Sequence, residues 1–244
     1  MQTADVKTVL VTGVSRGLGL AIARRLGRDG YRVVGLSRSL SDPYRALMAE
    51  HGDTVFFQEF DVGDIDAIPA MTADVIKRHG PLWGLVNNAG IGTDGVLATM
   101  HKTDIEEILR VNLTAPIVLA KFVSRNMLAR RQGRIVNISS IIASTGFSGL
   151  AVYAASKAGL EGLTRSLSRE VGKRGVTVNC VAPGYMETEM TEGLGEAQME
   201  SIRRRAPLGL PEPDDAAAGV AYFLGPDAAR VTGAVLTIDG GSTA

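Results

Sequence analysis

Residues 7–19 read KTVLVTGVSRGLG, an apolar run that leads directly into three closely spaced glycines. The apolar part, residues 7–12, has the length and the β-branched content of a buried strand. Residues 18–28 follow with apolar side chains at every fourth position, which places them on one face of a helix. A strand that joins a helix through a glycine-rich turn is typical of the first unit of a parallel α/β sheet.

The same alternation of strands and helices continues to the end of the chain. We expect further strands at residues 32–36, 54–60, 82–86, 134–139, 176–182 and 235–239. Further helices are expected at 65–78, 103–128 with an interruption near Pro116, 153–172 and 214–224. Strands that are almost continuously apolar indicate a parallel sheet covered on both faces. The sequence therefore predicts one α/β domain over residues 1–244, a Rossmann-type doubly wound parallel sheet with helices on both faces. Residues 183–213 lack a clear period and are expected to form a long functional loop.

The composition argues against several classes of protein. Lysine and arginine total 26, as do aspartate and glutamate, so the net charge is zero and nothing favours a nucleic-acid partner. No apolar run approaches the ~20 residues of a membrane span, and no signal peptide precedes the first strand. The single cysteine, Cys180, suits a reducing compartment. We therefore expect a cytoplasmic protein without membrane partners. The scattered His51, His79 and His101 predict no metal site.

The glycine-rich turn has the chemistry of a phosphate-binding loop. Glycines allow backbone N–H groups to approach a pyrophosphate without an intervening Cβ, and the helix that follows adds its partial positive charge. Any strand-to-helix turn can carry glycines, so the argument depends on the position of this turn at the first such join of the chain. The residues expected to contact a dinucleotide here are Gly13, Ser15, Arg16, Gly17, Leu18 and Gly19.

The end of the second strand predicts which dinucleotide is bound. NAD-specific sites place an acid about 20 residues beyond the loop to bind the ribose 2′-hydroxyl. Residues 35–39 read GLSRS and contain no acid, whereas Arg38, beside Ser37, can pair with a 2′-phosphate and Arg16 can add a second cation. The alternative is that both arginines are simply solvated. We predict NADP(H) as the cofactor.

Three further residues form a candidate catalytic group. Tyr153 and Lys157 are four positions apart in a predicted helix and so share one face. Ser140 follows the predicted fifth strand, at the edge of the sheet where ligands bind. An ammonium near a phenol favours the phenolate, so we expect Lys157 to lower the pKa of Tyr153 toward the working pH. The hydroxyl of Ser140 can hydrogen-bond a carbonyl oxygen as negative charge develops on it.

These patterns occur together in one family, which the chain closely resembles: the short-chain dehydrogenase/reductases. The resemblance extends over nearly the whole chain, and several independent motifs follow in the family's order. They are the turn at residues 12–19, Asp61-Val62, Asn87-Asn88-Ala89-Gly90, Asn112, Ser140, Tyr153-x-x-x-Lys157, Pro183-Gly184, Thr188 and Asp239-Gly240-Gly241.

The resemblance implies a role for each matching residue. Tyr153 would be the catalytic acid–base, Lys157 would also bind the nicotinamide ribose, and Ser140 would orient the substrate carbonyl. Asn112 would hold a water that links Lys157 to solvent protons. The remaining implied cofactor contacts are Asp61 and Val62 at the adenine, Asn88 with its neighbours Ala89 and Gly90 on the adenosine side, and Pro183, Gly184, Met186 and Thr188 near the nicotinamide and the phosphates.

Within this family the chain is most similar to the 3-oxoacyl-[acyl-carrier-protein] reductases, through residues 127–134 (MLARRQGR) and 173–179 (KRGVTVN). In those enzymes, arginines that match Arg131 and Arg174 bind the acidic carrier protein. The resemblance therefore implies a basic docking pair beside the mouth of the active site, where opposite charges steer encounter, and a homotetramer.

Two departures from the pattern keep the substrate open. Trp83 stands where an acidic residue is usual, and Val152 precedes the catalytic tyrosine where asparagine is frequent. Relatives of this kind also reduce steroids, quinones and other free ketones, which is the first alternative. A regulatory protein that senses NADP without catalysis is the second, although such proteins typically lose the tyrosine or the lysine. The leading hypothesis is reduction of a 3-oxoacyl thioester.

Overall fold

The computed structural model describes residues 6–186 and 196–244, in which seven parallel strands form one sheet. The sheet has the order β3-β2-β1-β4-β5-β6-β7, and every neighbouring pair is parallel. The strands are β1 (Thr8–Thr12), β2 (Arg32–Ser37), β3 (Val55–Glu59), β4 (Leu82–Asn87), β5 (Gly133–Ile138), β6 (Val176–Pro183) and β7 (Val235–Ile238). The predicted doubly wound α/β fold is confirmed, and each predicted strand overlaps an observed one.

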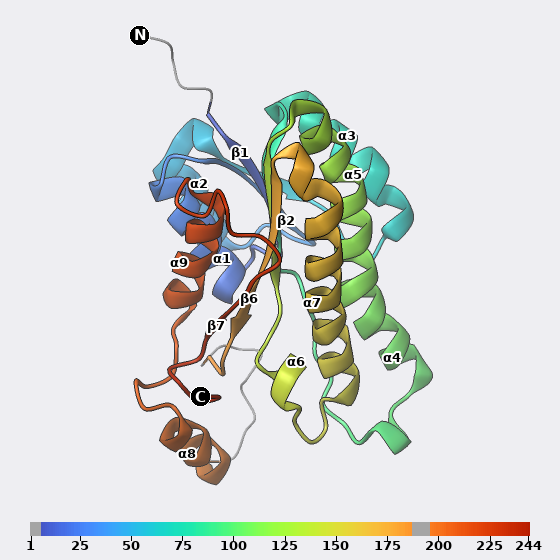
Figure 1. Cartoon of the computed structure of the whole chain (residues 1–244), viewed down its shortest axis with the longest axis vertical. Helices are drawn as coiled ribbons and strands as arrows, with labels where there is room; N and C mark the ends of the chain where they lie inside the picture. Colours follow the sequence, from blue (N-terminus) through green and yellow to red (C-terminus); the bar gives the residue numbers. More distant parts are fainter. Residues whose placement is uncertain (1–5, 187–195) are drawn as a thin grey trace.

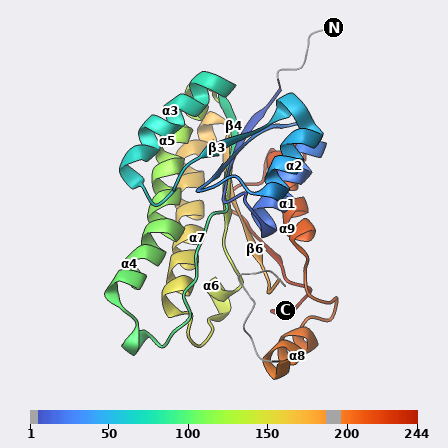
Figure 2. The same cartoon turned by 180° about the vertical axis from the view of Figure 1, so that it is seen from behind.

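Helices cover both faces of the sheet (Figures 1 and 2). One face carries α1 (Gly17–Arg28), α2 (Asp42–His51) and α9 (Pro213–Leu224). The other face carries α3 (Ile68–His79), α4 (Lys102–Leu109), α5 (Ala115–Arg130) and α7 (Ala151–Val171). The short α6 (Ile142–Thr145) and α8 (Glu196–Arg205) lie beyond the carboxyl ends of the strands. Among the residues described, no helix has the length and apolar character that crossing a membrane requires.

Each face of the sheet buries its own apolar cluster. Leu26 of α1 and Phe223 of α9 pack with Val136 of β5 on one side. Leu119 of α5 packs with Ile135, the residue of β5 that precedes Val136, on the other side. Successive strand residues thus point to opposite clusters, as a sheet covered on both faces requires. The five central strands, β2, β1, β4, β5 and β6, are buried along almost their whole length, so this part of the sheet offers polar chemistry only at its ends.

The carboxyl ends of β1 and β4 are joined where the strand order reverses. Connections from β1 run to β2 and β3 on one side, whereas β4 begins the series on the other side. The Thr12 hydroxyl oxygen accepts hydrogen bonds from the backbone N–H groups of Asn88 and Ala89, both at 2.9 Å. A reversal of this kind leaves a crevice above the strand ends, which is where open α/β sheets bind ligands.

The predicted helix at residues 103–128 is two helices joined by a π-helical turn, η4 (Arg110–Thr114). Pro116 lies in the first turn of α5, just after this turn. Proline lacks the N–H that would bond the carbonyl four residues earlier, so a regular helix cannot pass through this point. The predicted interruption is therefore present, but it falls a few residues before Pro116, and it places Asn112 in the widened turn.

Three helices lie outside the predictions: α2, α8 and the four-residue α6. The helix α2 was not expected, although Ser41 caps it by accepting a hydrogen bond from the Tyr44 N–H at 3.3 Å and proline follows in its first turn. The helix α8 lies within residues 183–213, which were expected to form a loop. Its charged sequence, EAQMESIRRR, gives a weak apolar period, so the prediction of an irregular stretch is wrong for this part.

Trp83, the residue that departs from the family pattern, contacts two cations at the amino end of the sheet. The Lys7 ammonium lies 3.9 Å from the centre of the indole ring, and the Arg134 guanidinium lies 4.7 Å from it. Arg134 is buried, and its Nε has no hydrogen-bond partner among the described residues. The indole face therefore stabilises a buried guanidinium through a cation–π contact.

Replacing Trp83 with leucine should lower the free energy of unfolding by about 2–4 kcal/mol, because it removes the aromatic face from a buried guanidinium and leaves a cavity. Urea denaturation followed by circular dichroism measures this loss. Tyr222→Leu is the control, since that aromatic side chain on α9 is exposed. If the urea midpoint of unfolding for Trp83→Leu equalled that of the wild type, the stabilising role of the indole would be contradicted.

Candidate active site

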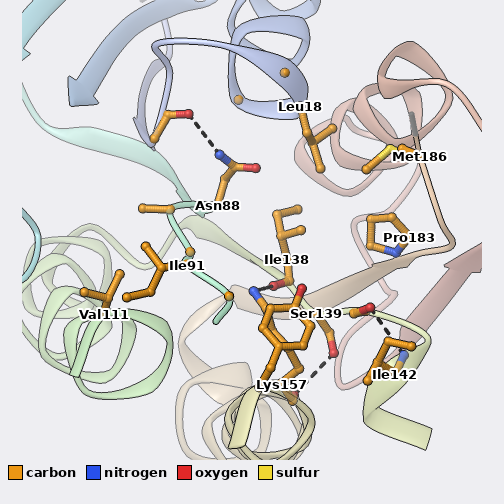
Figure 3. Close-up of a pocket in the computed structure, with 18 of the residues that line it drawn as sticks. Leu18, Asn88, Ile91, Val111, Ile138, Ser139, Ile142, Lys157, Pro183 and Met186 are labelled. Carbon is orange, nitrogen blue, oxygen red and sulfur yellow. Dashed lines mark hydrogen bonds between the residues drawn. The ribbon is translucent and has the colours of Figure 1, made fainter. Parts of the chain in front are cut away.

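A cleft of about 640 Å³ opens at the carboxyl ends of the strands. Figure 3 shows Leu18 and Asn88 on one side of it and Ser139 and Lys157 at its base, with Pro183 near the chain that leads to Met186. The volume is within the range of small-molecule and cofactor sites. The cleft thus occupies the place where the strand order reverses.

The glycine-rich turn forms the wall of the cleft between β1 and α1. Gly13 and Gly17 have positive φ angles of 73° and 52°, which side chains other than glycine rarely adopt. A Cβ on Gly19 would lie 2.0 Å from the Gly13 carbonyl oxygen, so no larger residue fits there. The Asn88 side-chain amide donates to the carbonyls of Thr12 and Gly13, at 2.9 and 3.2 Å. The turn therefore exposes backbone without side chains at the N-terminus of α1, which is the surface that a pyrophosphate group binds.

The end of β2 brings the predicted specificity residues to the same cleft. Ser37 and the exposed Arg38 line it, and Arg16 lines it from the glycine-rich turn. Asp61 and Val62, which follow β3, line it as well. The Asp61 carboxylate accepts a hydrogen bond from the Gly63 N–H at 2.8 Å, which holds this turn in place. Two arginines therefore border the pocket at the point where a nucleotide ribose is expected.

The residues predicted to bind the cofactor converge on this one cleft. All of them line it except Thr188, which lies outside the described residues. The set that lines it is Gly13, Ser15, Arg16, Gly17, Leu18, Gly19, Ser37, Arg38, Asp61, Val62, Asn88, Ala89, Gly90, Tyr153, Lys157, Pro183, Gly184 and Met186.

Ser140, Tyr153 and Lys157 also meet in the cleft. The Ser140 hydroxyl lies beside the Tyr153 phenol, and its oxygen accepts a hydrogen bond from the Ile142 N–H at 3.3 Å. Lys157 is almost completely buried, and its Nζ donates to the Ile138 carbonyl at 2.9 Å (Figure 3). A Cβ on Gly90 would lie 3.3 Å from that Nζ, so the loop after β4 passes directly over the amine.

Burial moves the pKa values of the phenol and the amine in opposite directions. It raises the pKa of Tyr153 above its ordinary value, and the nearby Ser140 hydroxyl only partly offsets this. Burial lowers the pKa of Lys157 to about 8, and the Cys180 thiol beside it acts in the other direction. The expected net lowering of the pKa of Tyr153 is wrong for this structure, because burial dominates. The amine is directed to the Ile138 carbonyl, and its nitrogen lies 5.5 Å from the centre of the phenol ring.

Asn112 braces the cleft rather than lining it. Its side chain is fully buried, and its oxygen accepts the Ile91 N–H while its amide donates to the Ile91 carbonyl, both at 2.8 Å. The amide also donates to the Ser156 hydroxyl at 3.2 Å. These contacts join the loop after β4 to α7 through the π-helical turn. The predicted water between Asn112 and Lys157 remains a prediction, because the contacts of Asn112 are with backbone and Ser156.

Several residues that line the cleft carry no motif and were not predicted. Asp239 accepts hydrogen bonds from the Gly241 N–H at 2.9 Å and the Thr243 hydroxyl at 2.6 Å, and this turn brings Ser242 and Thr243 to the pocket. The motif Asp239-Gly240-Gly241 therefore forms this turn. The other unpredicted lining residues include Ile142, Phe147, Leu150, Tyr185, Ile202, Arg205 and Leu210. No local sequence signal marks them, since the loops and the helices α6 and α8 bring them to the cleft only in the folded chain.

Arg131 and Arg174 lie at the opposite end of the sheet from the cleft. Arg131 ends α5 just before β5 begins, and Arg174 lies just before β6 begins. The two segments touch, since a Cβ on Gly175 would lie 2.5 Å from the Arg131 carbonyl oxygen. The cleft opens at the carboxyl ends of the same strands. The expectation that this basic pair flanks the mouth of the site is therefore wrong within one chain.

Comparisons with known proteins agree with this geometry. Residues 7–199 match the family model for short chain dehydrogenases. The chain is 41% identical over 236 residues to the 3-oxoacyl-[acyl-carrier-protein] reductase FabG of Vibrio cholerae, covering 96% of each chain. It is 38% identical over 236 residues to the 3-oxoacyl-[acyl-carrier-protein] reductase MabA of Mycobacterium tuberculosis, covering 96% of this chain and 92% of the relative.

A solved structure supports the same assignment. The crystal structure of a dehydrogenase/reductase from Sinorhizobium meliloti 1021 matches with a TM-score of 0.89 and 38% identity, over 98% of this chain and 95% of that one. The family resemblance read from the motifs is confirmed by the family model and by the relatives. The chain belongs to the short-chain dehydrogenase family and is an oxidoreductase.

Proposed function

We propose that this protein uses NADPH to reduce the ketone of a 3-oxoacyl thioester to a secondary alcohol. The observation that carries the proposal is that Ser140, Tyr153 and the buried Lys157 line the same cleft as the glycine-rich turn. The names of the relatives from Vibrio cholerae and Mycobacterium tuberculosis support this substrate.

The side chains supply the proton and the polarisation that ketone reduction needs. A bound nicotinamide cofactor supplies the hydride that adds to the carbonyl carbon. Tyr153 gives its phenolic proton to the carbonyl oxygen, and Ser140 donates a hydrogen bond to the same oxygen as its negative charge grows. The raised pKa of Tyr153 keeps the phenol protonated at neutral pH, as a proton donor requires. The Lys157 ammonium stabilises the phenolate that remains after proton transfer.

NADPH is favoured over NADH by the charge at the end of β2. Arg38 and Arg16 border the cleft, and no carboxylate follows β2 at Ser37–Ser39 to receive a 2′-hydroxyl. A guanidinium forms a strong, bidentate ion pair with a phosphate but contributes little binding energy to a ribose that carries no phosphate. The same reasoning underlies the sequence-based prediction of NADP(H).

The apolar part of the cleft supports an acyl substrate. Ile142, Phe147, Leu150 and Met186 line the cleft. These side chains suit an alkyl chain, but they also suit a cyclic ketone. Reduction of a free ketone is therefore the second candidate, and the position of Arg131 and Arg174 far from the cleft favours it. An acetoacetyl thioester and a panel of cyclic ketones, assayed side by side with NADPH, distinguish the two.

Replacing Tyr153 with phenylalanine should reduce kcat by at least about 100-fold, because it removes the phenolic proton that the proposed reaction transfers to the carbonyl oxygen. Consumption of NADPH, followed by its absorbance, measures the rate. NADPH affinity should remain close to that of the wild type, since the ring is retained. Unchanged turnover in this variant would exclude the proposed chemistry.

The rate of reduction should fall as the pH rises through about 8. Lys157 has a pKa of about 8 because it is buried, so it loses its proton and its charge above that pH. The phenol of Tyr153 stays protonated over this range, since its pKa is above the ordinary value. The pH profile of kcat/KM tests this, and a profile that stays flat to pH 10 would contradict it.

Arg38→Asp should raise the KM for NADPH at least about tenfold and lower the KM for NADH. The reason is that a carboxylate repels the 2′-phosphate of NADPH and accepts a hydrogen bond from the 2′-hydroxyl of NADH. Steady-state kinetics with both cofactors measure the switch. Arg45→Asp on the exposed face of α2 is a matched control of equal charge change. Equal KM values for NADPH in wild type and Arg38→Asp would rule out this role.

A carrier-protein partner and a homotetramer complete the proposal. A carrier protein docked on Arg131 and Arg174 reaches an active-site cleft only if a second subunit places its own cleft nearby. Docking at these arginines therefore requires the oligomer. Reversing both arginines to glutamate should raise KM about tenfold for a carrier-bound substrate and leave a small thioester unaffected, because the carrier is acidic. Sedimentation velocity gives the subunit number. An unchanged KM for the carrier-bound substrate would show that docking does not use these arginines.

A further inference from the structure

Three consecutive residues at the end of β5 contact one face of α7. The Ser140 hydroxyl lies beside the Tyr153 phenol, and the Ile138 carbonyl accepts a hydrogen bond from Lys157 at 2.9 Å. Between them, the hydroxyl of Ser139 lies 3.0 Å from a carboxylate oxygen of Glu161. The three helix residues are four positions apart, so they form a row along one face of the helix. Glu161 therefore extends the row of the candidate catalytic side chains by one more turn.

The contact between Ser139 and Glu161 is shielded from solvent. Ser139 is buried, and its backbone N–H is held by the Val181 carbonyl of β6 at 2.8 Å. The Glu161 side chain is only 15% exposed, and its second oxygen lies 3.6 Å from the Arg165 guanidinium. A hydrogen bond to a carboxylate is stronger than one between neutral groups, particularly away from water.

Two further observations locate the carboxylate against the strands. The Ser139 hydroxyl also lies 3.3 Å from the Lys157 carbonyl, so it contacts α7 between Lys157 and Glu161. Burial raises the pKa of the neighbouring Cys180 to about 12, and the Glu161 charge adds to this rise. Cys180 is fully buried in β6, so the carboxylate faces the sheet rather than solvent.

We propose that Glu161 is a positioning residue, which holds the end of β5 against α7 through Ser139 and so sets the distance between Ser140 and Tyr153. This inference rests on the proposed function, because it assigns Ser140 and Tyr153 to the reaction. Glu161 does not line the cleft among the described residues, so it acts through Ser139. Small displacements of reacting groups have large effects on rate.

The test compares three variants in the full-length protein. Glu161→Met keeps the length of the side chain but cannot accept a hydrogen bond, and kcat should fall about tenfold or more with KM for NADPH unchanged. Glu161→Gln retains an acceptor oxygen and should restore kcat to within about threefold of the wild type. Ser139→Ala removes the donor and should reproduce the loss of Glu161→Met. The double variant that combines Glu161→Met with Ser139→Ala should have a kcat no lower than that of either single variant, because both substitutions remove the same contact.

Controls separate positioning from general loss of structure. Glu170→Met changes an exposed glutamate on the same helix and should leave kcat unchanged. Melting temperature and NADPH affinity, measured for every variant, report folding independently of turnover. A kcat for Glu161→Met or Ser139→Ala close to that of the wild type would overturn the proposal. So would losses that multiply in the double variant, or a Gln variant as slow as the Met variant.

Failure of this inference and failure of the proposed function give different results. If Tyr153→Phe is inactive while Glu161→Met is fully active, only the role of Glu161 is wrong. If Tyr153→Phe keeps wild-type turnover, the assigned chemistry itself is wrong.

Discussion

The buried ammonium of Lys157 is the interaction on which the site depends. A charge removed from water needs a partner, and here the Ile138 carbonyl accepts its hydrogen bond at 2.9 Å. That contact fixes the end of β5 against α7, and the loop at Gly90 passes directly over the amine. Burial lowers the pKa of Lys157 to about 8, so the fold holds this amine close to the pH at which it loses its charge. The same burial raises the pKa of Tyr153, which suits a proton donor.

The cofactor half of the cleft depends on a different constraint, the close approach of backbone. Asn88 bonds the carbonyls of the glycine-rich turn, and Thr12 bonds the loop after β4, so the two strands at the point of reversal are tied together. Gly19 has no space for a side chain. Backbone donors at the start of α1 therefore face the cleft without obstruction, while Arg16 and Arg38 border it. The acid–base half and the phosphate-binding half meet at the loop of residues 88–92.

Much of this architecture could be predicted from residue patterns. The strands were found because each is a short apolar run, and the motif residues were found because their spacing is rigid within a helix or a turn. The errors have physical causes. The helix α8 is polar, so its period is weak, and Pro116 shifts the helix break into the preceding π turn. The pKa of Tyr153 depends mainly on the burial of the phenol, and spacing along a helix does not determine that. Arg131 and Arg174 were expected beside the cleft because they match docking residues of relatives, but both precede strands and so lie at the amino end of the sheet.

The sequence by itself determined the fold class, the glycine-rich turn and the row of Tyr153 and Lys157, because each depends on contacts between residues close in the chain. Only the tertiary structure decided which distant residues complete the site. Asn112 bonds both polar groups of Ile91, and Ser139 reaches Glu161 across the junction of β5 and α7. These contacts join segments about 20 residues apart through different elements, so they depend on how a helix packs on a sheet. Packing is a property of the whole core, and no local pattern records it.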